Sequence, residues 1–153
     1  MRFEITPLGG IGPVRFGMSR QETRDALSLP AVSYKKTPED AAPTDAFLES
    51  AFQVFYDEKG QVEYIELSRS GEFEAIYDGL SVFDTPADEV IERISQSSEW
   101  EEPEPGYGFA FPVLELRLWR QSLPDPEEEG NNTDGIYFDT VGIGRRGYFT
   151  NLR

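Results

Sequence analysis

The sequence predicts an α+β fold in which a unit of one short helix and an antiparallel β-sheet occurs twice, with the helices on one face of the sheet. Two stretches each have the pattern of a strand end followed by a short helix. Each is then followed by a long irregular segment and a run of short strands. Runs of strands after a helix favour an antiparallel α+β arrangement over a doubly wound sheet. We expect residues 1–78 and 79–153 to be the two repeats of one compact unit, because each is small for an independent core.

The two helix-bearing stretches, residues 12–27 and 79–94, resemble each other in pattern more than in residue identity. The aligned pairs are Phe16 with Phe83, Glu22 with Glu89, Thr23 with Val90, and Leu27 with Ile94. Self-similarity of this kind indicates an internal repeat.

Both predicted helices have start signals. Ser19 with Glu22 three residues later has the spacing of a capping box, in which side chain and backbone bond reciprocally. Thr85, followed by Pro86 and Asp88, predicts the equivalent start of the second helix.

The strands of the first half follow a proline-rich segment, residues 31–45, that is typical of a loop. Residues 52–56 are then expected to form a strand, residues 57–60 a tight hairpin turn, and residues 62–67 the returning strand. Residues 72–77 alternate polar and apolar side chains, as a half-buried strand does.

The second half contains the clearest alternation in the chain, at residues 113–120. It predicts a strand with Leu114, Leu116 and Leu118 toward the core, and Glu115, Arg117 and Trp119 on the opposite face. The remaining predictions are loops at 97–108 and 124–134, both acidic, and strands at 109–111, 136–139, 141–143 and 148–150.

The charge of the chain restricts its partners. Twenty-nine acidic residues against 14 basic ones give a net charge of −15 over 153 residues. Such a field repels nucleic-acid phosphates and anionic lipid and favours a basic protein. We therefore expect no nucleic-acid or membrane partner.

Two residue types are missing, and their absence excludes several chemistries. Without cysteine the chain has no disulfide, thiolate nucleophile or cysteine metal site, and without histidine it has no imidazole ligand or Ser-His-Asp triad. The N-terminus lacks the apolar run of a secretory signal, and no stretch approaches the roughly 20 apolar residues that span a bilayer. These patterns favour a cytoplasmic location.

The segment from Val14 to Leu27 resembles the opening of two related groups, the β-lactamase-inhibitor-protein-like family and the SmpA/OmlA outer-membrane-assembly lipoproteins. The matching core is Phe16-Gly17-Met18-Ser19 followed by Glu22. The resemblance implies a short helical layer on an antiparallel sheet, occurring twice as in the inhibitor proteins, and a protein-binding role. The disulfides and the lipobox cysteine of those relatives have no counterpart here, so the resemblance carries over neither β-lactamase inhibition, envelope assembly nor any contact residue.

Two short motifs match enzyme signatures by letter. Residues 142–147 fit G-x-G-x-x-G, but a strand-like segment follows where the dinucleotide mechanism needs a helix, so we interpret them as a glycine-rich turn. Residues 33–36 fit S-x-x-K, but Pro30 and Pro38 bracket them, so the helix that the mechanism needs is not expected.

Carboxylates are the only abundant catalytic groups, and they concentrate in the loops 97–108 and 124–134. Clustered carboxylate oxygens bind Ca²⁺ or Mg²⁺, so a carboxylate-based divalent-metal-binding protein or hydrolase is the alternative function. Solvated acidic loops are the commoner cause of such clusters, and no specific metal ligand, catalytic residue or cofactor is predicted.

The favoured hypothesis is a non-enzymatic protein-binding module, of immunity or inhibitor type, that binds a cationic partner through one sheet face. Tyrosine, tryptophan and arginine dominate interface energetics, and the residues predicted to bind the partner are Arg117, Trp119, Arg120, Tyr64 and Tyr137. The alternative interpretation of Trp119 is that it packs into a second small core or under the loop 124–134. An accessory domain without a distinct site is a third hypothesis.

Overall fold

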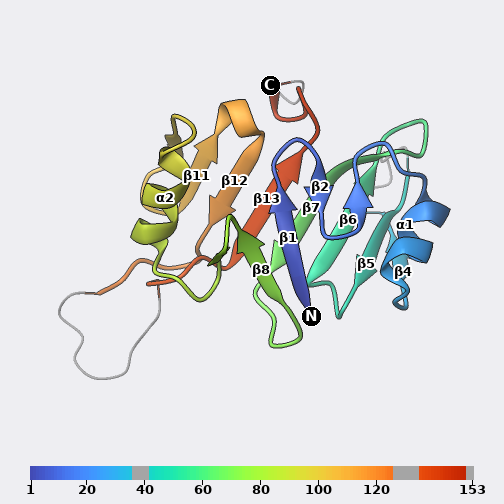
Figure 1. The fold of residues 1–153 in the computed structure, drawn as a ribbon, viewed down its shortest axis with the longest axis horizontal. Coiled ribbons are helices and arrows are strands. Elements are labelled where there is room, and N and C mark those ends of the chain that lie inside the picture. Colours follow the sequence, from blue (N-terminus) through green and yellow to red (C-terminus); the bar gives the residue numbers. More distant parts are fainter. Residues whose placement is uncertain (36–41, 126–134, 151–153) are drawn as a thin grey trace.

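The computed structural model of the chain describes residues 1–35, 42–125 and 135–150. These residues form a mixed α+β structure with two α-helices and two β-sheets (Figure 1), which confirms the predicted fold class. The finer prediction, a tandem repeat with its helices on one face of the sheet, stays a prediction.

The smaller sheet has five strands in the order β3-β2-β1-β8-β9. Its strands are β1 (Arg2–Thr6), β2 (Gly10–Ile11), β3 (Val14–Arg15), β8 (Glu74–Tyr77) and β9 (Leu80–Ser81). At its centre β1 and β8 run parallel, with Phe3 opposite Ala75. The expected purely antiparallel pairing is therefore wrong at this point, because β2–β7 and α1 form a long connection that returns β8 beside β1 in the same direction.

The larger sheet has eight strands in the order β10-β11-β12-β13-β7-β6-β5-β4, and every pair is antiparallel. Its strands are β4 (Val32–Tyr34), β5 (Thr44–Phe47), β6 (Phe52–Tyr56), β7 (Val62–Ser68), β10 (Glu101–Glu104), β11 (Gly108–Phe111), β12 (Leu116–Trp119) and β13 (Thr140–Gly144). Strand β7 of the first half and β13, the last strand of the second half, pair in the middle, with Ile65 opposite Ile143.

The helices are α1 (Arg20–Leu27) and α2 (Ala87–Ser95). The capping box of α1 is confirmed: Ser19 accepts the backbone N–H of Glu22, and the Glu22 side chain accepts that of Ser19. The predicted Thr85 start of α2 is wrong. Pro86 occupies the N-cap position, and no side-chain hydrogen bond caps the helix there because proline has no side-chain acceptor.

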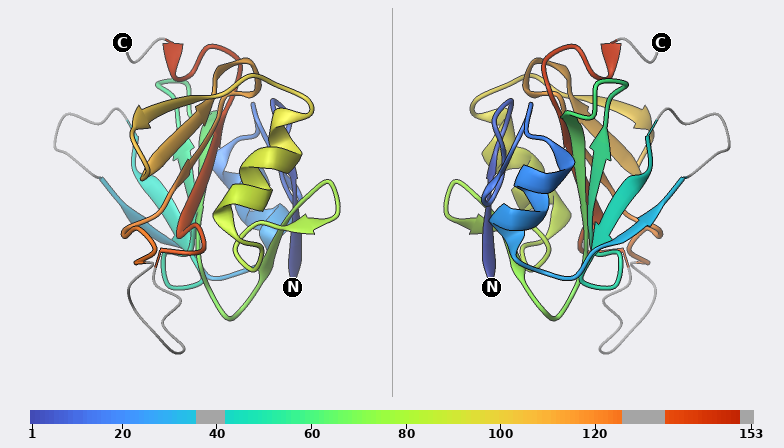
Figure 2. Two further views of the ribbon diagram at one scale, coloured as in Figure 1. Left: turned by 90° about the vertical axis from the view of Figure 1, so that its left-hand side faces the viewer. Right: turned by 90° about the vertical axis from the view of Figure 1, so that its right-hand side faces the viewer.

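One core lies between the eight-stranded sheet and the elements packed beside it, which are the five-stranded sheet and the helices (Figure 2). Phe3 of β1 contacts Phe52 of β6, with ring centroids 5.0 Å apart. Val90 and Ile94 of α2 are buried in the same cluster as Leu118 of β12. Because both halves contribute to this cluster, residues 1–78 and 79–153 share one hydrophobic core.

A buried carboxylate attaches α1 to the sheet. Asp45 of β5 is fully buried and accepts hydrogen bonds from Arg20 and Arg24 of α1, the latter at 2.8 Å to Nη2. Ser33 and Tyr56 also donate to it, at 2.6 and 3.0 Å. Every oxygen of this buried charge is therefore partnered, which is what makes its burial tolerable.

Several predicted elements differ from those in the structure. In place of one strand over 113–120, residues Pro112–Leu114 form a 3₁₀ turn, and β12 starts only at Leu116. Short strands β4, β5 and β10 occur where the loops 31–45 and 97–108 were expected. Residues 136–139 and 148–150 form no strand. The acidic loop 124–134 lies outside the described residues from 126 onward.

Within the described ranges, neither helix has the length and apolarity that crossing a membrane requires.

Candidate protein-binding site

A groove lies between α2 and the hairpin of β10 and β11. It has a volume of about 500 Å³. Its lining residues are Asp88, Ile91, Glu92 and Ser95 of α2, Trp100, Glu102, Gly106 and Phe109 of the hairpin region, and Arg120. A second hollow of about 640 Å³ shares Ser95 and Trp100 with the groove.

The α2 side of the groove follows from the pattern of the helix. Ala87, Val90, Ile91 and Ile94 are buried, so the helix packs on the core through these apolar residues. Asp88 and Glu92, one turn apart, remain exposed and line the groove. Asp88 lies in the first turn, where a negative charge interacts favourably with the helix dipole.

The other side of the groove is a hairpin with a tight turn. Tyr107 donates its backbone N–H to the carbonyl of Glu104 at 2.9 Å, and Gly106 adopts a positive φ of 83°. The carboxylate of Glu102 accepts the backbone N–H of Gly106 at 3.0 Å. Glu102 is thus held by the turn, with its residue exposed at the groove.

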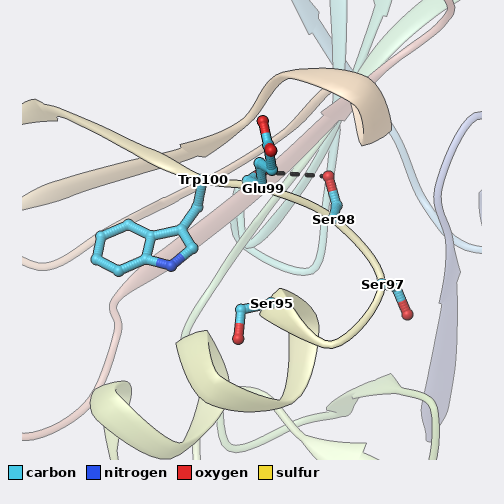
Figure 3. A pocket seen from close by; sticks show the side chains of 5 residues that line it. All are labelled: Ser95, Ser97, Ser98, Glu99 and Trp100. Atoms are coloured by element: carbon cyan, nitrogen blue, oxygen red, sulfur yellow. Dashed lines mark hydrogen bonds between the residues drawn. The ribbon is translucent and has the colours of Figure 1, made fainter.

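Trp100 is the large apolar side chain that the groove exposes. Its fractional exposure is 41%, and its ring lies 5.7 Å from that of Phe109. Figure 3 shows the ring projecting above Ser95 at the end of α2, while the Glu99 side chain points away from Ser95. An exposed tryptophan beside a buried phenylalanine gives the groove an apolar surface for a partner to cover.

The charged side chains that line the groove differ in their hydrogen bonding. Arg120, its cation, donates from Nε to the carbonyl of Gly106 at 2.7 Å and from Nη1 to that of Gly135 at 2.9 Å. By contrast, neither the Asp88 nor the Glu92 carboxylate forms a hydrogen bond or ion pair with any residue that the structure describes. With three carboxylates (Asp88, Glu92 and Glu102) against the one guanidinium of Arg120, the lining of the groove has a net negative charge next to Trp100.

The predicted partner-binding residues fall in three places. Tyr64, Arg117 and Trp119 lie on one face of the eight-stranded sheet, which we call the outer face; strand register and alternation put them there with Gln53 and Glu66. Arg120 lies at the groove, where it supports backbone carbonyls. Tyr137 lies near Arg69, whose guanidinium carbon is 5.4 Å from its ring centroid. The structure thus brings together three of the five.

The outer face is covered in part by residues 145–150. Tyr148 stacks on Tyr64 with ring centroids 4.8 Å apart, and the Arg117 guanidinium lies 4.4 Å from the ring centroid of Phe149. Tyr64 is consequently only 6% exposed. Burial, with the nearby charges of glutamates, raises the pKa of Tyr148 to about 12. The expectation that Tyr64 is available to a partner is wrong, because this segment occupies its surface.

Trp119 is half-buried on the outer face. This partial burial is compatible with both predictions for it, which are binding to a partner and packing. A Cβ added at Gly108 would lie 3.3 Å from both Trp119 Cδ1 and the Glu104 Cβ. The missing side chain at residue 108 therefore leaves room for the indole beside β11.

The short motifs have structural explanations. Gly142 and Gly144 belong to β13, and a turn follows them, so residues 142–147 do not open a helix. Ser33 lies in β4 and bonds to Asp45, while Lys36 lies outside the described residues. No group of three or more acidic residues with the geometry for a metal ion occurs among residues 1–35, 42–125 and 135–150.

Sequence reasoning missed Trp100, Asp88 and Glu92 as site residues. The available signal was a tryptophan within the acidic segment 99–104, shortly after an amphipathic helix. No protein-family model, curated protein or solved structure matches the chain. The resemblance to the inhibitor-like and SmpA/OmlA groups therefore stays a prediction, and the groove is interpreted from its own geometry.

Proposed function

We propose that this protein is a non-enzymatic protein-binding module whose partner presents a basic surface to the groove between α2 and the β10–β11 hairpin. The observation that carries the proposal is Trp100, 41% exposed at a groove that also contains unpaired carboxylates. Tryptophan is enriched among the residues that dominate binding energy. A partner that covers it gains apolar burial and neutralises charge together.

The charge of the whole molecule supports the same partner. A net charge of −15 attracts a cationic protein and accelerates its association at low salt. The profile fits an immunity or inhibitor-type protein by analogy of charge and size. A cytoplasmic location belongs to the same proposal.

The proposed contact site differs from the sheet face that the sequence predicts. Tyr64 is beneath Tyr148, and Arg117 is engaged with Phe149, so much of the outer face is already occupied. Trp119 is the remaining candidate there, which makes it the natural competitor of Trp100 in an experiment.

The scaffold that we propose for this site is the predicted doubled unit. The element order supports it: residues 1–78 contain β1–β3, α1 and β4–β8, and residues 79–153 contain β9, α2 and β10–β13. Its helices are proposed to share one face of the eight-stranded sheet, and the views of Figure 2, in which both lie on the side of β1, support this.

The test is affinity capture from a lysate of the source organism with three immobilised forms of the full chain. Wild type is compared with Trp100→Ala and with Trp119→Ala, each at about 50 mM and about 500 mM NaCl, since screening shortens from roughly 14 to 4 Å over that range. We expect a basic protein that wild type and Trp119→Ala retain at low salt, and that Trp100→Ala and high salt release.

Two other results would contradict the proposal, one by moving the binding site and the other by removing the function. Loss of the retained protein with Trp119→Ala but not with Trp100→Ala would return the site to the outer face. Retention of no protein that depends on either tryptophan would overturn the protein-binding function itself. Urea unfolding of all three forms confirms that each is folded.

A further inference from the structure

The two helices hold equivalent positions in the element order, but they differ in whether their charged side chains form ion pairs with the sheet. Both lie beside outer strands at opposite ends of the eight-stranded sheet (Figure 1). On α1, Arg20 and Arg24 are one turn apart, and both bond to Asp45 of the neighbouring strand β5. The first half therefore contains a complete set of two helix charges and an opposite charge from the sheet.

On α2 two acidic residues have the same spacing, at the positions that align with Gln21 and Asp25 of α1, and they have no ion pair with any described residue. Asp88 and Glu92 of α2 have the same spacing of four residues and line the groove. The adjacent strand β11 offers Phe109 there, and the hydrogen bonds of Arg120 go to the carbonyls of Gly106 and Gly135. Like charges four residues apart on a helix destabilise each other, so a cation placed between them is favoured.

We propose that the groove binds an arginine side chain of an extended basic segment of the partner, with the guanidinium between the α2 carboxylates and the Trp100 ring. This inference rests on the proposed protein-binding function and names the chemistry that the site recognises.

Three features favour arginine in an extended segment over other cations. A guanidinium is planar, so it stacks on an indole while its edge donates to carboxylates, which an ammonium group does less well. Trp100 supplies the indole, and Asp88 and Glu92 supply the acceptors. The groove and the second hollow share Ser95 and Trp100, so the concave surface continues beyond the arginine site, where residues next to the arginine can lie.

The test uses the full chain with Trp119→Phe, in which Trp100 is the single tryptophan and its fluorescence reports on the groove. The probe is a blocked pentapeptide, Gly-Arg-Ala-Arg-Gly. It is compared with counterparts in which both arginines are replaced by lysine or by citrulline, the neutral isostere of arginine. We expect the arginine peptide to cause a saturable change in the Trp100 emission. The lysine peptide should bind several-fold more weakly than the arginine peptide, and the citrulline peptide about tenfold more weakly.

Matched charge variants separate local contact from the general field of the protein. Asp88→Asn/Glu92→Gln should weaken the arginine peptide about tenfold. The control Glu72→Gln/Glu89→Gln removes the same charge from exposed positions that do not line the groove, and it should weaken binding less than twofold. Circular dichroism and urea unfolding establish that every variant is folded.

Three results would overturn the inference: equal binding of the citrulline peptide, equal weakening by the two charge variants, or no binding at 10 mM arginine peptide. None of them affects the proposed function, which is judged by the dependence of a captured protein on Trp100. A captured protein that needs Trp100 in the absence of arginine selectivity would leave the protein-binding module standing and remove only the arginine assignment.

Discussion

Replacing Asp45 by asparagine tests the account of how α1 is held to the sheet. Asparagine has nearly the same shape, but it exchanges one acceptor oxygen for an NH₂ donor. In the wild type both carboxylate oxygens accept, Oδ1 from Arg20, Arg24 and Ser33, and Oδ2 from Arg24 and Tyr56. The substitution therefore removes a buried charge and turns a donor toward other donors.

The magnitude follows from which groups are left without a partner. Removing one member of a buried ion pair costs about 3–5 kcal/mol. The arginine side chains are 27% and 37% exposed, so they regain some hydration, and the lower end of that range applies. We expect the free energy of unfolding to fall by about 3 kcal/mol, or the Tm by about 6–12 °C for a chain of this size.

The pH dependence of the same variant has a definite sign. Burial raises the pKa of the Asp45 carboxyl, but the hydrogen bonds from Arg24, Ser33 and Tyr56 and the charge of Arg20 outweigh it and lower that pKa below its ordinary value. The stabilisation is thus present above the ordinary pKa of about 3.9 and is lost as the pH falls through the lower folded-state pKa. The difference between wild type and Asp45→Asn should therefore narrow below about pH 4.

The assay is urea unfolding followed by tryptophan fluorescence and circular dichroism, at pH 7 and at several values down to pH 3. Asp25→Asn is the matched control, because it makes the same change at an exposed position of α1 and should alter stability by less than about 0.5 kcal/mol. A loss below about 1 kcal/mol for Asp45→Asn, or a difference that widens toward low pH, would refute the reasoning.

Two further predictions concern the outer face. Gly142→Ala should lower the free energy of unfolding by about 1–3 kcal/mol, because the added Cβ would lie 2.0 Å from the Tyr64 hydroxyl oxygen. Urea unfolding should show that most of this loss disappears in a Tyr64→Ala background, and equal losses in both backgrounds would contradict the contact. Glu115→Gln should cost about 1–3 kcal/mol, because this carboxylate is 6% exposed and accepts the backbone N–H groups of Gly147 and Phe149 at 3.0 Å. Those two amides should then exchange faster with solvent in NMR experiments; unchanged exchange would show that the carboxylate does not anchor the segment.

Local patterns predict well where neighbouring residues decide the structure. The hairpin of β6 and β7 is confirmed because its strands alternate and its turn is self-contained: Asp57 accepts the backbone N–H groups of Lys59 and Gln61. The capping box of Ser19 and Glu22 is confirmed for the same reason, since all its atoms lie within one turn of helix.

Local sequence patterns fail where residues distant in the sequence determine the structure of a segment. Glu115 looks like an outward residue of a continuous strand, yet it adopts a positive φ of 50° and is buried. Its partners, Gly147 and Phe149, come from a segment about thirty residues later. The segment 101–104 has the composition of a loop, and it forms β10 because β11 offers it an edge to pair with.

The candidate site was beyond local prediction for the same reason. Alternation correctly places Arg117 and Trp119 on one face of the sheet, but it carries no information about Tyr148 covering Tyr64. Trp100 lines a groove between α2 and the β10–β11 hairpin, and no local pattern encodes how those two elements pack.

The amino-acid sequence by itself determined the charge of the protein, the chemistries closed to a chain without cysteine and histidine, the α+β class, and the short-range elements. Tertiary structure alone decided that β1 runs parallel to β8, that β7 pairs with β13, and that α2 leaves an acidic groove open beside Trp100. Periodicity and capping are set by contacts within a few residues. Strand partners and grooves arise from contacts across the chain, where packing and the pairing of buried polar groups select among many arrangements compatible with the same local pattern.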